Sequence, residues 1–246
     1  MIFLLPPSES KHTGGSRSEL KLSFPSLDGT RSSIRMALIE LSRNPKAATM
    51  ALKLGPKQVG ELEVNLDLAR PITMPAIHRY TGVLYNAVKV SESSKAQLSR
   101  AGRMVFIQSP LFGLVSALDE IPNYRLSAGS RVPGINLKSA WRAAHQTIWD
   151  DLQSKIIIDL RSKAYAALAP IPEHIDAYEV EVVAEIQSGK VRALSRLNKE
   201  AKGRFLRAAI NLAVKPTKLG DLDMAAKLAG MKLHIQGRTL LLITNS

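Results

Sequence analysis

The chain has 246 residues, of which 45% are hydrophobic and 22% are charged, and this composition excludes a disordered protein. The absence of cysteine excludes disulfides and thiolate metal sites. Lys and Arg number 34 against 21 Asp and Glu, and the net charge of +13 favours nucleic acid or an anionic metabolite as the partner, with a generally basic proteome as the alternative explanation. Residues 1–5 are too short for a signal sequence and no apolar run is long enough to span a membrane, so we expect a cytoplasmic protein with no membrane partner.

Strands and helices alternate from the start of the sequence. Residues 2–5 are wholly apolar and predict a buried strand that ends at Pro6. The segment 14–30 is rich in Gly, Ser and Thr and predicts a loop, after which Ser32 or Ser33 can cap a helix that ends near Ser42. Further helices are predicted over 45–54, 56–66 and 74–88.

The second half of the sequence alternates in the same way. Strands are predicted over 104–108, 120–126, 155–160, 178–187 and 239–244, with 155–160 central and 120–126 at an edge because of Pro122. Helices are predicted over 139–153, with Ser139 as cap, and over 161–168, 194–213 and 221–231. This order predicts one α/β (α+β) domain, residues 1–246, with a mixed β-sheet core flanked by helices and a helical hairpin segment at 31–70.

Positive charge is concentrated near the end of the sequence. Between Gly189 and Ser246 there are twelve Lys and Arg but only three acids. Residues 194–213 have an amphipathic pattern, with apolar residues such as Leu197 and Phe205 on one face and cations on the other. We predict contacts to DNA phosphates from this basic side, whose cations are Arg192, Arg196, Lys199, Lys202 and Arg207.

A polar loop follows the first strand. Ser8 and Lys11 fit the S-x-x-K pattern of serine acylases, but the S-D-N and K-T-G elements of that class do not occur. The glycines follow the lysine, so the loop is not a Walker A motif. A loop at the carboxyl end of a strand can bind an anion through hydroxyls, an ammonium and backbone N–H groups, and a simple polar turn is the alternative.

A second candidate for phosphate binding is the helix–turn–helix pattern of residues 45–66. Two short helices joined by a glycine-containing turn can offer backbone N–H groups to a DNA phosphate without reading sequence. Lys53, Gly55 and Lys57 would make these contacts in a helix-hairpin-helix-like insert. An ordinary αα-hairpin without a ligand is the alternative.

Metal and acid chemistry have little support. The five histidines are far apart and lack metal-ligand spacing, so we expect neither a metal site nor a cofactor. Acid pairs such as Asp150 with Asp151 also fit helix ends and turns, and whether the protein is an enzyme stays open.

Seven short motifs occur in order along the sequence. They are LLPPSESK (4–11), RYTG (79–82) with Tyr85, SPLFG (109–113), NYRL (123–126) with Gly129, NL (136–137) with Trp141, DLRSKAY (159–165) and KEAKG (199–203). Together they resemble the motifs of the YaaA family of peroxide stress proteins. Some positions depart from the family pattern, notably Pro110, Phe112, Asp159, Lys163 with Ala164, and Lys202. These departures indicate a divergent member that shares the fold more securely than the ligand.

The resemblance implies a mixed α/β fold, a helix-hairpin-helix-like element and a basic cleft. It also implies binding to DNA without sequence specificity and protection against oxidative damage, which makes the 45–66 segment the favoured DNA contact. Related domains occur with the modification of bases in DNA, so a pocket for a nucleotide or another small anion is the alternative.

Two hypotheses follow from these residues, and a nucleoid-associated or oligomeric scaffold is a third. The first is a monomeric DNA-binding stress protein; the second is an enzyme that acts on a nucleobase or nucleotide. The second requires a set of polar side chains to converge: Ser8, Lys11, Arg79, Tyr80, Tyr85, Ser109, Tyr124, Arg125, Asp159 and Ser162.

Overall fold

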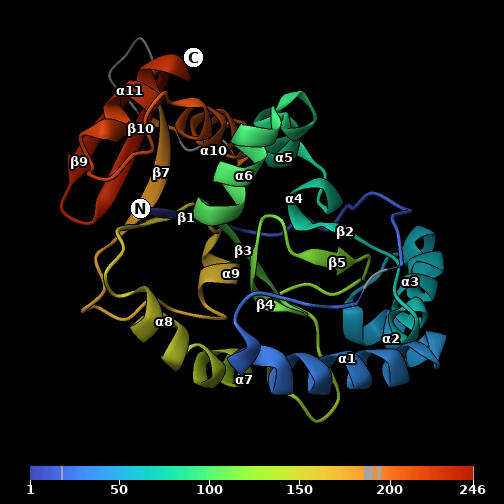
Figure 1. The fold of residues 1–246 in the computed structure, drawn as a ribbon. Coiled ribbons are helices and arrows are strands. Elements are labelled where there is room, and N and C mark those ends of the chain that lie inside the picture. Colours follow the sequence, from blue (N-terminus) through green and yellow to red (C-terminus); the bar gives the residue numbers. More distant parts are fainter. Residues whose placement is uncertain (18, 186–190, 193–194, 246) are drawn as a thin grey trace.

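A mostly parallel sheet lies at the centre of the fold (Figure 1). The computed structural model describes residues 1–17, 19–185, 191–192 and 195–245. Neighbouring strands are parallel from β3 to β10, while β4, β9 and β8 pair antiparallel with β3, β10 and β7. In spatial order the strands are β4 (Gly113–Ser116), β3 (Val105–Ser109), β1 (Ile2–Leu5), β6 (Ile157–Asp159), β7 (Ala177–Glu185), β10 (Thr239–Asn245) and β9 (Met231–Gln236), with β8 (Val191–Arg192) beside β7.

The predicted strands are confirmed, with shifted ends. The one predicted over 120–126 is shortened to three residues, and residues 186–187 of the one predicted over 178–187 lie outside the described residues. β1 and β6 lie side by side in the middle of the sheet and every residue of both is buried, because a central parallel strand is covered on both faces. The extended segment at Pro122 is β5 (Glu120–Pro122), which pairs with β2 (Thr73–Pro75) in a separate two-stranded sheet. The mixed α/β architecture is therefore as predicted.

Helices cover the two faces of the main sheet (Figure 1). Phe3 packs against Phe205 of α10 (Ser195–Asn211), so the Phe3 face is the one that α10 covers. Gln108 points to the opposite face, where it contacts His145 between two further helices. The first face carries α5 (Val83–Val88), α6 (Lys95–Met104) and α10, and the second carries α1 (Asp28–Ser42), α7 (Leu137–Ala144) and α8 (Gln146–Leu152).

Several helix predictions were wrong at their boundaries. The first helix begins at Asp28, directly after η1, a 3₁₀ turn over Pro25–Leu27, and neither Ser32 nor Ser33 caps it. Asn136 caps α7 by accepting a hydrogen bond from the Ser139 backbone, which corrects the prediction that Ser139 is the cap.

The prediction of one helix over 74–88 was also wrong. The segment contains β2, then α4 (Ala76–Arg79), then α5. Gly82, with a φ of 98°, separates the two helices, because few residues with a side chain adopt this conformation.

The predicted helix over 56–66 is not one α-helix but a 3₁₀ helix followed by a short α-helix. The segment before it is α2 (Pro45–Leu52), capped by Asn44, as the position of Pro45 predicts. After Lys53–Gly55 the chain continues as η2, a 3₁₀ helix over Pro56–Leu62, and then as α3 (Glu63–Leu66) and the 3₁₀ turn η3 (Asp67–Ala69).

The remaining helices are short. They are η4 (Val90–Glu92), a 3₁₀ turn, α9 (Lys163–Ala166) and α11 (Asp221–Leu228). Within the described part of the chain, no helix has both the length and the apolar composition that crossing a membrane requires.

Candidate functional site

The loop that follows β1 is a fixed extended segment and not a simple polar turn. Lys11 pairs with Tyr80 and Ser16 pairs with Thr73 in antiparallel bridges. Gly15 approaches the Thr73 carbonyl so closely that a Cβ there would lie 2.1 Å from the oxygen. The backbone of residues 10–16 is thereby held against the segment 72–81.

Arg79 holds this loop from behind. Its side chain is fully buried and its guanidinium donates to four backbone carbonyls, of His12 at 2.6 Å, Gly14 and Ile72 at 3.0 Å, and Ile121 at 3.2 Å. The prediction that Arg79 lines a ligand pocket is therefore not supported by its position, because backbone carbonyls use four of its five N–H donors.

Three buried hydroxyls form a chain at the end of β3. The hydroxyls of Tyr80 and Tyr124 lie 2.8 Å apart, and the Tyr124 hydroxyl lies 2.9 Å from Ser109 Oγ. Ser109 Oγ also accepts from the backbone N–H groups of Leu111 and Phe112. Burial raises the pKa of Tyr80 and of Tyr124, so both phenols are neutral at physiological pH.

Lys11 lies over these two tyrosine rings. Its Nζ is 4.1 Å from the centre of the Tyr124 ring and 5.7 Å from that of Tyr80, and it donates to the Glu9 carbonyl at 3.2 Å. The pKa of Lys11 falls to about 7, first because burial disfavours the ammonium and second because Arg125 repels it. We call Glu9, Lys11, Tyr80, Ser109, Tyr124 and Arg125 the Lys11 cluster.

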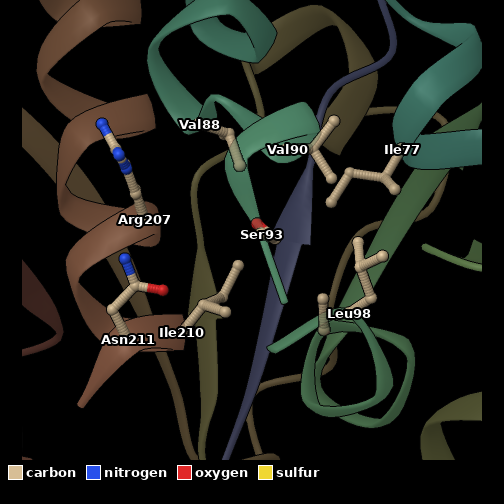
Figure 2. Close-up of a pocket in the computed structure, with 9 residues that line it drawn as sticks. Ile77, Val88, Val90, Ser93, Leu98, Arg207, Ile210 and Asn211 are labelled. Carbon is tan, nitrogen blue, oxygen red and sulfur yellow. The ribbon is translucent and has the colours of Figure 1, made fainter. Parts of the chain in front are cut away.

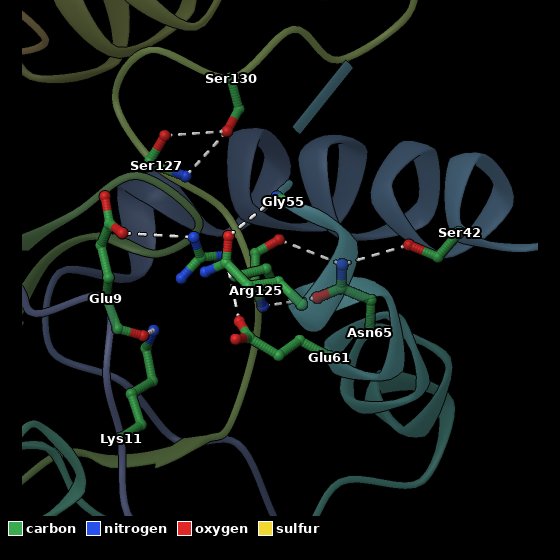
Figure 3. Close-up of polar contacts among 10 residues, drawn as sticks. Glu9, Lys11, Ser42, Gly55, Glu61, Asn65, Arg125, Ser127 and Ser130 are labelled. Atoms are coloured by element: carbon green, nitrogen blue, oxygen red, sulfur yellow. Dashed lines mark hydrogen bonds and ion pairs between the residues drawn. The ribbon is translucent and has the colours of Figure 1, made fainter. Parts of the chain in front are cut away.

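Arg125 is fixed by carboxylates on two sides (Figure 3). Its Nη2 lies 3.2 Å from Glu9 Oε2, and its Nε lies 3.3 Å from Glu61 Oε2 in η2. The buried Asn65 side chain accepts from the Arg125 N–H and donates to the Arg125 carbonyl. The segment after α2 is thereby attached to the Lys11 cluster.

The other predicted pocket residues surround the cluster or lie apart from it. Ser8 is beside Ser10 and Gly82, and the Tyr85 hydroxyl donates to the Pro6 carbonyl. Ser162 is exposed at the start of α9, and it makes no hydrogen bond to the cluster among the described residues.

Asp159 is committed to an internal ion pair. Arg161 contacts both of its carboxylate oxygens, at 2.9 and 2.8 Å. Asp159 is in register with Leu4, so its side chain is on the Leu4 face of the sheet. Ser109 is four residues after Val105, which is in register with Phe3, so its side chain is on the Phe3 face. Because successive residues of a strand point to opposite faces, Asp159 and Ser109 are on opposite sides of the sheet. The prediction that Asp159 joins the same pocket as Ser109 is not supported by this geometry.

The predicted DNA contacts near α2 are exposed. Lys53 and Lys57 are in no ion pair with the described residues. Lys53 has a φ of 57° and ends α2, and its Nζ lies near Gly129. Gly55 is half-buried, and its N–H is hydrogen-bonded to the Gln58 side chain.

The predicted basic face of α10 is only partly on the surface. Lys202 is buried and donates to the Leu160 carbonyl, and burial lowers the pKa of its ammonium, so it is not placed to contact DNA. Arg207 is half-exposed and paired with Glu92 at 2.7 Å, whereas Lys199 is exposed. Leu197, predicted on the buried face, is 39% exposed. Arg192 and Arg196 lie outside the residues whose side chains the structure describes.

A hollow between α10 and α5 is too small to be a ligand site (Figure 2). Its volume is about 10 Å³, and it is lined mainly by apolar residues such as Val88, Val90 and Ile210. A space of this size holds at most about one water molecule.

Comparisons with known proteins identify the family. The family model described as peroxide stress protein YaaA matches residues 1–230. The chain belongs to the YaaA family. It is 38% identical over 249 residues to a UPF0246 protein of Corynebacterium efficiens, with 97% of each chain covered. It is 33% identical over 242 residues to a UPF0246 protein of Streptomyces coelicolor, with 96% of this chain and 93% of the relative covered.

The motifs that resemble the YaaA family meet in space although they are far apart in sequence. Lys11, Tyr80, Ser109 and Arg125 each come from a different motif and all belong to the Lys11 cluster. Glu61 and Asn65 were not predicted, because a single acid and a single amide in a helical segment have no distinctive spacing. Glu9 was part of a quoted motif, and its pairing with Arg125 needed the fold to be seen.

Proposed function

We propose that this YaaA-family protein binds DNA phosphates without sequence specificity and thereby protects DNA during peroxide stress. The observation that carries the proposal is that Lys53 and Lys57 are exposed and in no ion pair with the described residues, on the segment that Glu61 attaches to the Lys11 cluster. Glu61, which follows them in η2, is paired with Arg125, so their charge is less offset than the sequence suggests. The exposed Arg131 is close to them, because its N–H donates to the Ala51 carbonyl at 2.8 Å.

The net charge of +13 supports the same proposal. A cationic surface attracts a polyanion and releases its counterions, and contacts to phosphates carry no sequence information. Protection would then follow from occupancy of the DNA by the protein. It is measured as strand breakage in peroxide-treated DNA with and without the protein.

Salt titration of duplex binding tests the proposal. The logarithm of the binding constant is expected to fall linearly with the logarithm of salt concentration, with a slope of about −0.9 for each phosphate contact. Lys53→Glu and Lys57→Glu are each expected to weaken binding to unrelated duplexes by one common factor and to make the slope shallower by about 0.9. Lys95→Glu is the matched control, since Lys95 is exposed at the start of α6, away from α2 (Figure 1).

Two results would overturn the proposal. One is the absence of duplex binding at about 50 mM salt, where phosphate contacts are strong. The other is an equal loss of affinity in Lys95→Glu and in the two α2 variants, because the contact would then have no defined place on the surface.

A second candidate function, an enzyme that acts on a nucleobase or nucleotide, is favoured by the Lys11 cluster. A lysine amine whose pKa is lowered to about 7 by burial and by a neighbouring guanidinium is a candidate for a functional group. Nucleotides at a concentration of 100 times their Kd would stabilise the protein by about 2.7 kcal/mol. A thermal-unfolding screen with nucleotides tests this candidate, and a Lys11→Met variant that keeps the full shift would contradict it.

A further inference from the structure

We propose that the Lys11 amine is a nucleophile that condenses with an aldehyde to form an imine. The aldehyde belongs either to the ring-opened sugar of an abasic site in DNA or to a free small aldehyde. The first source rests on the DNA binding proposed above. The chemistry of the amine itself does not depend on it.

The geometry holds the amine in one place. The Lys11 backbone is bridged to Tyr80, and the side chain lies over the Tyr124 ring, with Nζ 4.1 Å from its centre. Lys11 is half-buried, so the residue keeps part of its surface exposed to solvent. A fixed amine at a partly open position can meet a carbonyl carbon without a large loss of side-chain entropy.

The surrounding acids do not neutralise Lys11. Among the described residues no carboxylate lies within 4.0 Å of its Nζ, because Glu9 and Glu61 are both directed to Arg125. Lys11 therefore has only one described hydrogen-bond partner, the Glu9 carbonyl, and it is repelled by the neighbouring guanidinium. This is the arrangement that disfavours an ammonium and favours a free amine.

Burial and the charges around Lys11 together lower the pKa of its amine to a value near neutral pH. At a pKa of about 7, about half of the amines are unprotonated at pH 7, against on the order of one in a thousand for an ordinary lysine. Burial is the largest cause of the lowered pKa. Arg125 and Arg79 lower the pKa further, whereas Glu9 and Glu61 raise it. The neutral groups that face the amine are the rings of Tyr80 and Tyr124.

The proposed step is a condensation without any redox change. The Nζ lone pair forms a bond to the aldehyde carbon, and the electrons of the C=O bond go to oxygen, which takes a proton from solvent while the nitrogen releases one. The resulting carbinolamine loses its hydroxyl with a second proton as water, and the nitrogen releases its remaining proton to leave a C=N bond between Lys11 and the aldehyde carbon. Hydrolysis of this imine regenerates both partners.

The location of the amine suits an aldehyde that is attached to a polyanion. Lys53 and Arg131 are exposed near the segment that carries Arg125, so phosphates on either side of a damaged sugar would meet cations. The base that is missing at an abasic site leaves room for the lysine side chain, whose Nζ lies 4.1 Å from the centre of the Tyr124 ring.

Reductive trapping tests the proposal. The full-length protein is incubated with cyanoborohydride and one of three probes: a duplex with an abasic site, the same duplex with a tetrahydrofuran analogue that has no aldehyde, and glyceraldehyde 3-phosphate. A covalent adduct is expected with the abasic duplex and not with the analogue, and peptide mapping of the wild-type adduct is expected to locate it on Lys11. Its rate should rise with pH and reach half its maximum near pH 7.

Two variants and a parallel binding measurement make the test specific. Lys11→Arg is expected to lose the adduct, since a guanidinium stays protonated, whereas Lys95→Arg at an exposed position on α6 is expected to keep it. An adduct that maps to other lysines, or that survives in Lys11→Arg, would overturn the proposal. Mapping needs no variant, so it applies even if Lys11→Arg does not fold.

The outcomes separate this inference from DNA binding. Tight binding of both duplexes without an adduct from any probe would overturn the imine and leave the DNA proposal standing. An adduct on Lys11 from glyceraldehyde 3-phosphate, with no binding to either duplex, would support the imine with a free aldehyde and overturn the DNA proposal.

Discussion

The contact between α10 and α5 depends on the absence of a side chain at Gly203. A Cβ at this position would lie 2.3 Å from the Leu84 carbonyl oxygen and 2.7 Å from Ala87 Cβ. A backbone carbonyl cannot move aside as a flexible side chain can, so Gly203→Ala must push the two helices apart. Excess volume in a packed contact costs about 3 kcal/mol at the upper end of its usual range, and the better helix propensity of alanine returns about 1 kcal/mol.

We therefore expect Gly203→Ala to lose about 2 kcal/mol of unfolding free energy, which lowers the Tm of a chain of this size by about 4–8 °C. Urea and thermal unfolding measure this loss. Gly29→Ala is the control, because Gly29 is in α1 and a Cβ there would meet nothing within 4 Å. It is expected to gain about 0.5–1 kcal/mol. A Gly203→Ala variant as stable as wild type would refute the close packing of α10 on α5.

Two further predictions concern Arg79 and Lys11. Arg79→Lys should lower the free energy of unfolding, measured in urea, by about 3 kcal/mol, because an ammonium cannot reach all four carbonyls that the guanidinium now contacts. A loss below about 1 kcal/mol would contradict this role of Arg79. Between pH 7 and 10.5 the unfolded chain keeps a proton on Lys11 that the folded protein has released. The free energy of unfolding should therefore rise with pH over this range, by at most about 1.4 kcal/mol per pH unit. Lys11→Met should lack this rise, and identical pH profiles for it and wild type in urea unfolding would contradict the lowered pKa.

Much of the sheet was predictable from local sequence. Residues 2–5 and 156–158 are unbroken apolar runs, and this pattern is typical of central parallel strands. The helix boundaries were harder, because capping by Asn136 and the positive φ of Gly82 depend on single residues. The 3₁₀ helix at Pro56–Leu62 has the same apolar spacing as an α-helix over its few residues, so the pattern could not separate the two.

Five of the ten predicted pocket residues belong to the Lys11 cluster, and Arg79, Asp159 and Ser162 do not. Lys11, Tyr80, Ser109, Tyr124 and Arg125 were all named from motifs, and they converge. The sequence could not reveal that Arg79 binds backbone carbonyls or that Asp159 is paired with Arg161, since both follow from which face of the sheet and which side of the loop each side chain occupies. The family resemblance identified these motifs as one set, and the fold then showed which of their residues are neighbours in space.

The pairing of β1 has a consequence for biosynthesis. Phe3 is in register with Val105 of β3 and with Ile158 of β6. The backbone hydrogen bonds of β1 to these two strands can therefore form only after residues far along the chain have left the ribosome. The four apolar residues of β1 stay without their final partners while most of the protein is made. Sheets closed by such distant contacts fold slowly and expose apolar segments to aggregation. Synthesis rate and chaperone supply are therefore expected to control the yield of this protein more than its final stability does.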